Sequence, residues 1–213
     1  MRFSITLATT VTAIGFVAFA LSAAAAIDLT PEVREYTAEG VKFQQLIFHD
    51  DKQAIEYELP ERWTFNAASS RLQLRPPDKK FAEAIIQTVS LTKPEALDEN
   101  VCKALKEKFL TTLPPGSQLV KVEQEIQNPI LLDGNPSFEI IVSYQVAAGK
   151  FLESALFVDL RDTQIVFNLT APKEDFPALH SELKHSIFSW HWLGEKSEAT
   201  ASEAKAVTAA GQN

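Results

Sequence analysis

The first residues to test for chemistry are histidines and aspartates of the kind that hold metal ions. The candidate ligands are His49, Asp50, Asp51, His180, His185 and His191. On a helix, His180 and His185 would lie about 140° apart, because five residues make more than one full turn. Metal-binding histidine pairs on one helix usually stand four residues apart, on the same face. We therefore expect no metal site in this protein.

A nucleophilic enzyme needs a serine, threonine or cysteine beside a base that a third group orients. The chain has no G-x-S-x-G motif, and its one cysteine, Cys102, lies in an expected helix with no histidine close in sequence. Glu153 and Asp159 share a strand face, as they also would on a solvated sheet. The seven glycines form no phosphate-binding loop. We expect no catalytic residue and no cofactor. The enzymatic alternative is a hydrolase whose site residues are distant in sequence and come together in the fold near the closing helix.

Three consecutive residues, Trp190, His191 and Trp192, are the candidate partner-binding residues. Exposed tryptophan side chains carry much of the binding energy at many protein interfaces. The alternative is structural: Trp190 would complete the buried stripe of the preceding helix, and Trp192 would cover the edge of the core. The apolar spacing of that helix favours the structural interpretation.

The elements that position these residues begin with a hairpin and a helix near the C-terminus. One parity of the segment carries Leu152, Leu156, Val158 and Leu160, the other carries Glu153 and Asp159, and the alternation resumes over 165–169 after a short turn. This period of two predicts an antiparallel hairpin over 151–170 with one face on a core. Residues 173–190 then repeat apolar side chains every three or four positions, which predicts an amphipathic helix that covers the sheet.

Upstream of the hairpin, the chain is expected to form further strands and one helix. Thr92 and Glu95 make a capping box that predicts a helix from there to about Leu113. Alternating apolar residues, with prolines or polar turns between them, predict the strands. The expected strands cover residues 41–49, 55–59, 72–74, 82–91, 120–126 and 139–146.

The composition divides the chain into four parts. Arg2, an uncharged apolar stretch and a run of small residues predict a cleaved signal peptide over 1–26. Residues 27–40 are short and polar, and we expect an N-terminal arm or a loose helix there. A single domain should follow over 41–193. Residues 194–213 lack aromatic side chains and should form a disordered tail.

The net charge of the chain and its expected compartment restrict the classes of partner that it can bind. The formal net charge is -8 at pH 7, and no long run of basic residues is present. Phosphate backbones are bound by clustered lysine and arginine, so we expect no nucleic-acid partner. Cleavage of the signal peptide leaves no stable membrane span and exports the protein to the periplasm or the extracellular space. The single cysteine, Cys102, excludes an intramolecular disulfide and is expected to be buried as a small apolar residue.

Two segments of the chain resemble the PsbP-like family, which includes bacterial envelope proteins of the DcrB kind. Residues 57–63 (YELPERW) are similar to the strand, proline and tryptophan near the start of the family's domain, and residues 186–190 (SIFSW) to its closing pattern. The resemblance implies an antiparallel sheet between helices, an α/β/α sandwich of the α+β class, over 41–192. It brings no catalytic residue with it, and it implies an accessory or partner-binding role.

The expected function is therefore that of an exported, non-enzymatic accessory or binding protein that acts on another envelope protein or a small ligand. A hydrolase, and an apolar-ligand holder or chaperone, are the alternatives. A concave group of titratable side chains would support the hydrolase. An apolar cavity would support the ligand holder, and an exposed apolar patch the partner binder.

Overall fold

The structure is a computed structural model, and it describes residues 27–38, 40–50, 54–91, 96–160 and 163–193. The predicted signal peptide, the predicted C-terminal tail and the capping box expected at Thr92 and Glu95 lie outside these ranges.

A seven-stranded sheet forms the centre of the domain, and each pair of neighbouring strands runs antiparallel. The predicted C-terminal hairpin is confirmed, with Phe167 opposite Leu156. In order across the sheet, the strands are β4 (Thr64–Ala68), β5 (Arg71–Arg75), β6 (Glu83–Ser90), β10 (Thr163–Pro172), β9 (Gly149–Asp159), β8 (Ser137–Val146) and β7 (Gln118–Gln127).

A second, four-stranded sheet contains the segment that the sequence predicted as an arm. Residues 27–38 form a strand that pairs with the next strand along the chain, so the expectation of an arm or loose helix at 27–40 was wrong. The reason is that Ile27 and Leu29 are buried in the core, which the polar composition of the rest of this segment conceals. In order, the strands are β1 (Ile27–Ala38), β2 (Val41–Asp50), β3 (Ala54–Glu58) and β11 (His191–Leu193).

Two helices complete the described part of the chain. α1 (Glu99–Leu110) begins later than predicted, because Asp98 caps it by accepting a hydrogen bond from the backbone N–H of Val101. α2 (Phe176–Ile187) has a proline in its first turn and buries the apolar stripe expected for it, but it ends three residues before the predicted end at 190. Neither helix is long and apolar enough to cross a membrane.

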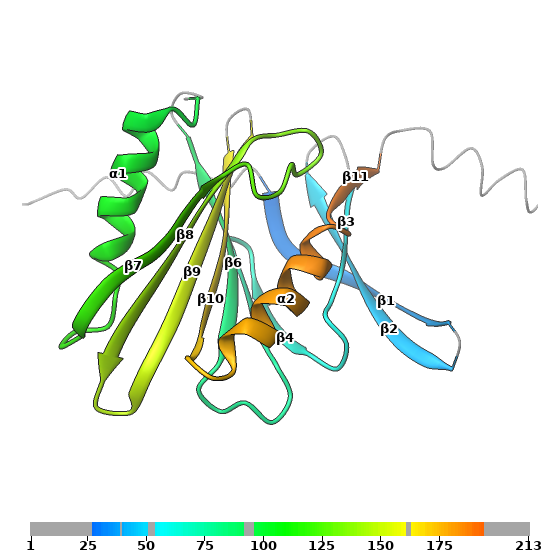
Figure 1. The fold of residues 1–213 in the computed structure, drawn as a ribbon. Helices are drawn as coiled ribbons and strands as arrows, with labels where there is room; N and C mark the ends of the chain where they lie inside the picture. The colour runs from blue at the N-terminus through cyan, green and yellow to red at the C-terminus, as the bar shows by residue number, and fades with distance from the viewer. Residues whose placement is uncertain (1–26, 39, 51–53, 92–95, 161–162, 194–213) are drawn as a thin grey trace, which may run out of the picture.

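The alternation along the strands decides which layer each side chain joins. On β9, Leu156 and Val158 belong to a core shared by the small sheet and α2, whereas Ala155 and Phe157 belong to a second core under α1. The large sheet therefore has α2 and the small sheet on one face and α1 on the other. Figure 1 shows α1 beside β7 and β8, and α2 lying across the sheet near β10. The predicted α+β architecture is confirmed.

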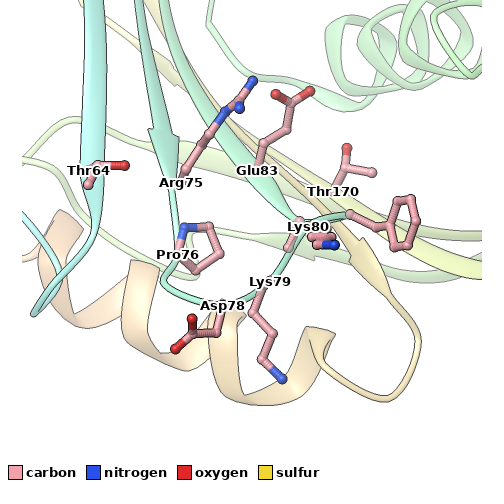
Figure 2. A pocket seen from close by; sticks show the side chains of 10 residues that line it. Thr64, Arg75, Pro76, Asp78, Lys79, Lys80, Glu83 and Thr170 are labelled. Carbon is pink, nitrogen blue, oxygen red and sulfur yellow. The ribbon is translucent and has the colours of Figure 1, made fainter.

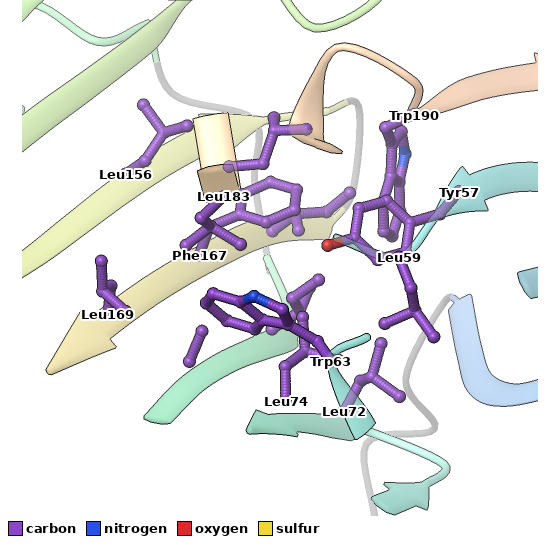
Figure 3. Packing of buried hydrophobic residues seen from close by; sticks show 14 of the residues in the cluster. Tyr57, Leu59, Trp63, Leu72, Leu74, Leu156, Phe167, Leu169, Leu183 and Trp190 are labelled. Carbon is purple, nitrogen blue, oxygen red and sulfur yellow. The ribbon is translucent and has the colours of Figure 1, made fainter. Parts of the chain in front are cut away.

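Trp190 is the centre of the larger core. Its side chain is 2% exposed, and its ring lies 5.5 Å from those of Phe48 and Phe167 and 5.6 Å from that of Tyr57. These partners come from β2, β10 and β3, so one indole joins both sheets. Figure 3 shows Trp190 beside Tyr57, with leucine side chains packed around them. Side chains thus occupy the space between sheet and helix where an apolar-ligand holder would need its cavity.

Candidate functional site

The face of the large sheet that carries α1 is covered over only part of its width. The core under α1 draws its side chains chiefly from β7, β8 and β9. Beyond it, β4, β5, β6 and the end of β10 turn polar side chains to the same side. We call this surface the open face, and it comprises Thr64, Asn66, Gln73, Arg75, Glu83 and Thr170.

Two adjoining pockets hollow the open face. The larger has a volume of about 630 Å³ and is formed by the ends of β4, β5, β6 and β10 together with the loop over 76–82. The smaller, of about 290 Å³, lies over β4 and β5 and shares Thr64 and Arg75 with the first. Figure 2 shows Arg75 and Glu83 rising from neighbouring strands into the larger pocket. Polar side chains thus line a concavity in the size range of small-ligand sites.

The cations of the larger pocket differ in whether a carboxylate neutralises them. The ammonium group of Lys79 lies 2.5 Å from Asp175 at the start of α2, and this pairing raises the pKa of Lys79. Arg75 and Lys80 form no ion pair with any residue in the described ranges. Two positive charges therefore face solvent in a hollow of an acidic protein, free to bind a ligand.

A buried carboxylate lies on the same side of the sheet, next to the pocket. Glu153 on β9 is 7% exposed, and it accepts a hydrogen bond of 3.0 Å from the side-chain amide of Asn168. Burial raises the pKa of Glu153, the charge of Glu83 adds to that effect, and hydrogen bonds from Asn168, Tyr144 and Thr170 oppose it. Burial and the neighbouring Glu153 likewise raise the pKa of Tyr144. The solvated strand face predicted for Glu153 was wrong, because Tyr144 and the next strand cover it.

Replacing Glu153 with glutamine should stabilise the protein at neutral pH. Because the pKa of Glu153 is higher in the folded protein than in the unfolded chain, the ionised carboxylate lowers the free energy of unfolding. This destabilisation is complete above the pKa of the folded state and absent below the pKa of the unfolded state. The amide retains an oxygen for Asn168 and removes the charge. We expect Glu153→Gln to raise the free energy of unfolding by about 1 kcal/mol near pH 7, as measured by urea unfolding.

The pH dependence gives the control for this change. The advantage of Glu153→Gln should shrink as the pH falls toward the unfolded pKa of a glutamate, since the wild-type carboxyl then becomes neutral too. A variant that is less stable than wild type at both neutral and acid pH would show that the ionised form of Glu153 is favoured by its surroundings.

The histidines considered as metal ligands or catalytic bases lie in separate places. His180 on α2 bonds at 2.6 Å to Glu139 on β8, on the face opposite the open face. His191 pairs at 2.9 Å with Glu56, and His49 lies 3.9 Å from Glu32, both in the small sheet. His185 bonds at 2.8 Å to the backbone carbonyl oxygen of Ser181 on its own helix. The described residues contain no group of three possible ligands that would hold a metal ion.

The tripeptide predicted to bind a partner does not form one continuous surface. Trp190 is buried in the core, as the structural alternative required. His191 is exposed on the outer side of β11, and Trp192 is half-buried, with its ring 6.5 Å from that of Trp190. Successive residues of a strand point to opposite faces, so His191 and Trp192 face different ways. Only His191 and the outer edge of Trp192 are accessible to a partner.

Cys102 is buried on α1, as predicted. Its thiol lies 3.7 Å from the carbonyl oxygen of Leu97 and 3.9 Å from the side-chain amide of Gln127. Burial raises the pKa of the thiol. A buried, protonated thiol is a poor nucleophile, so the packing role fits the geometry.

The sequence alone did not identify the residues of the open face as candidate site residues. Arg75 and Glu83 stand at strand ends and match no motif, and their proximity depends on the pairing of β5 with β6. One signal was present: Arg71, Gln73 and Arg75 make one face of β5 fully polar, which is typical of a sheet face without a covering layer.

Comparison with known proteins places the chain by fold. No known protein family and no curated protein matches the sequence. The PsbP protein of the cyanobacterium Synechocystis sp. PCC 6803 has a similar structure, with a TM-score of 0.51 and 11% identity over 86% of this chain and 97% of that one. The Pseudomonas aeruginosa protein PA94, of unknown function, gives a TM-score of 0.43 and 15% identity over 73% of this chain and 94% of that one.

The class of protein that follows is an α+β sandwich with a PsbP-like fold, as the sequence resemblance indicated. At 11% identity the likeness shows the fold alone. The role of the chain must therefore be argued from its own surface.

Proposed function

We propose that this is an exported, non-enzymatic binding protein that recognises another envelope protein through the open face. The observation that carries the proposal is the pair of pockets over β4, β5, β6 and β10, both lined by Arg75, whose charge has no ion-pair partner in the described part of the chain. A hollowed, polar sheet face with an unpaired arginine is suited to binding a polar partner, because arginine is enriched at interfaces and forms directional hydrogen bonds.

Export is supported by the first 26 residues of the sequence, where a basic start, an apolar stretch and small residues follow one another. The PsbP-like fold fits a non-enzymatic accessory role, because the PsbP-like proteins that the sequence resembles act as accessory or partner-binding proteins. Periplasmic or extracellular location belongs to this proposal.

The geometry supports binding better than hydrolysis. Within the described ranges, His180 bonds to Glu139 and to no hydroxyl or thiol group, so the arrangement of a nucleophile beside its base is missing there. Glu153 is held by amide and hydroxyl donors in a buried position. A carboxylate held by several hydrogen bonds in this way maintains the shape of a binding face.

Affinity capture from an envelope extract of the source organism, after mild crosslinking, tests the proposal. The full chain carries either wild-type Arg75, Arg75→Glu, or the matched control Arg71→Glu. Arg71 lies on the same strand and the same face, is also exposed, and lines neither pocket. We expect a protein retained saturably by wild type and Arg71→Glu, and lost by about tenfold or more with Arg75→Glu.

Equal retention by all three proteins would contradict binding through the open face. Equal loss with both variants would show that only net charge matters, which also contradicts it. Circular dichroism of each variant confirms that the fold is intact before capture is compared.

A further inference from the structure

In the larger pocket, one cationic and one anionic side chain lie on neighbouring strands and form no ion pair with each other. The last paired residues of β5 and β6 are Leu74 and Ala84, so Arg75 and Glu83 come next on each strand and point to the same side. In this position an arginine and a glutamate ordinarily form an ion pair. The described residues contain no such pair within 4.0 Å, and Figure 2 shows both side chains extending into the pocket.

A third residue explains why Glu83 stays apart from Arg75. The side-chain amide of Gln73, on β5, donates a hydrogen bond of 2.5 Å to Oε2 of Glu83. Oε1 of Glu83 has no hydrogen-bond partner among the described residues. The carboxylate is thus fixed by one oxygen and offers the other to the pocket, while the guanidinium of Arg75 offers its N–H groups.

The remaining lining adds hydroxyl groups and an apolar wall. Thr64 and Thr170 flank the two charges, from β4 and β10. Phe81, in the loop between β5 and β6, is 64% exposed and lines the same pocket together with Pro76. An exposed phenylalanine beside a charged pair provides a surface on which an apolar side chain can pack.

We propose that this pocket binds a free α-amino acid with a large apolar or aromatic side chain. The guanidinium of Arg75 binds the carboxylate, the free oxygen of Glu83 binds the ammonium group, and the side chain lies against Phe81. An α-amino acid fits because its ammonium and carboxylate groups are attached to the same carbon atom. The two groups can therefore bind at the same time to Glu83 and Arg75, which lie on neighbouring strands. A dianion such as phosphate is disfavoured, because Glu83 would repel it.

The inference goes beyond the proposed function: both use the open face, but the amino-acid site is argued from the residues of the larger pocket alone. Ligand titrations followed by isothermal calorimetry and by the NMR signals of the purified full chain test it. The probes are L-phenylalanine, 3-phenylpropanoate, which lacks the ammonium group, and 2-phenylethylammonium, which lacks the carboxylate. We expect saturable binding of L-phenylalanine and about tenfold weaker binding of each of the other two, because each loses one charge-assisted hydrogen-bonding group.

Variants assign the two charges to their residues. Arg75→Gln should weaken L-phenylalanine about tenfold and leave 2-phenylethylammonium unchanged, and Glu83→Gln should weaken L-phenylalanine while leaving 3-phenylpropanoate unchanged. Arg71→Gln, on the same face outside the pocket, should bind as wild type does. Thermal unfolding shows that each variant is folded.

Several results would overturn the inference. They are the absence of saturation by L-phenylalanine at about 10 mM, equal affinity for all three probes, or equal weakening by Arg71→Gln and Arg75→Gln. If L-phenylalanine fails to bind while Arg75→Glu still loses the captured protein, only the amino-acid inference falls. If L-phenylalanine binds and protein capture does not depend on Arg75, the proposed protein recognition falls and the amino-acid site stands.

Discussion

Replacing Trp190 with alanine should remove a large part of the stability of the domain, about 3–5 kcal/mol in the free energy of unfolding. The indole is 2% exposed and packs against aromatic rings from β2, β3 and β10. Its loss leaves a cavity between the two sheets, which the surrounding backbone can close only in part. Urea unfolding of the full chain, followed by circular dichroism, measures the change.

Trp192→Ala is the matched control, because it deletes the same side chain two residues later. Trp192 is half-buried at the edge of the core, so we expect a loss smaller by about half than that of Trp190→Ala. Equal losses from the two variants, or a stable Trp190→Ala protein that no longer captures a partner, would contradict the structural role of Trp190. The pair of variants thus separates a core residue from a binding residue within one tripeptide.

The parts of the fold that sequence predicted are those where burial leaves a regular pattern. The apolar parity that contains Leu156 and Val158 identified β9 and its partner β10, and the spacing of apolar residues identified α2. β10 and α2 bury mainly one face, so the compositions of their two faces differ, whereas β9 is buried on both faces over much of its length. Trp190 is buried, as the structural interpretation expected, although it lies three residues beyond the end of α2 and not on the helix itself.

Other parts failed because their residues depend on contacts distant in sequence. The buried apolar residues Ile27 and Leu29 lie at the start of β1, and the strand is held along its length by pairing with β2. Glu139 and Glu153 alternate with apolar residues just as exposed glutamates do, yet both are buried. Their partners are tens of residues away or on another strand: His180 for Glu139, and Asn168 for Glu153. No local pattern distinguishes a covered glutamate from a solvated one.

Glu139→Gln should destabilise the domain by about 1–3 kcal/mol near pH 7. The side chain of Glu139 is 3% exposed, and it bonds to His180 at 2.6 Å and to Lys184 at 3.5 Å, both on α2. It thus joins α2 to the large sheet by charged hydrogen bonds. The side chains of His180 and Lys184 are 18% and 27% exposed, so water can partly replace the lost acceptor and keeps the effect below that of a fully buried pair.

The pH dependence of that loss identifies its cause. Burial alone would raise the pKa of Glu139, but the hydrogen bond and charge of His180, together with Lys184, hold it below its ordinary value. A carboxyl with a lowered folded pKa contributes stability that is complete above its unfolded pKa and is lost as the pH falls through the folded pKa. The difference in unfolding free energy between wild type and Glu139→Gln should therefore be largest near neutral pH and shrink in acid.

Urea unfolding of both proteins at about pH 7 and about pH 4 checks this expectation. Glu174→Gln provides the control, because Glu174 is exposed in the turn just before the same helix and forms no ion pair within the described ranges. It should change stability by less than about 0.5 kcal/mol at either pH. A difference between wild type and Glu139→Gln that stays constant across this range would assign the loss to packing of the side chain, because a packing contribution does not depend on the ionisation of the carboxyl group.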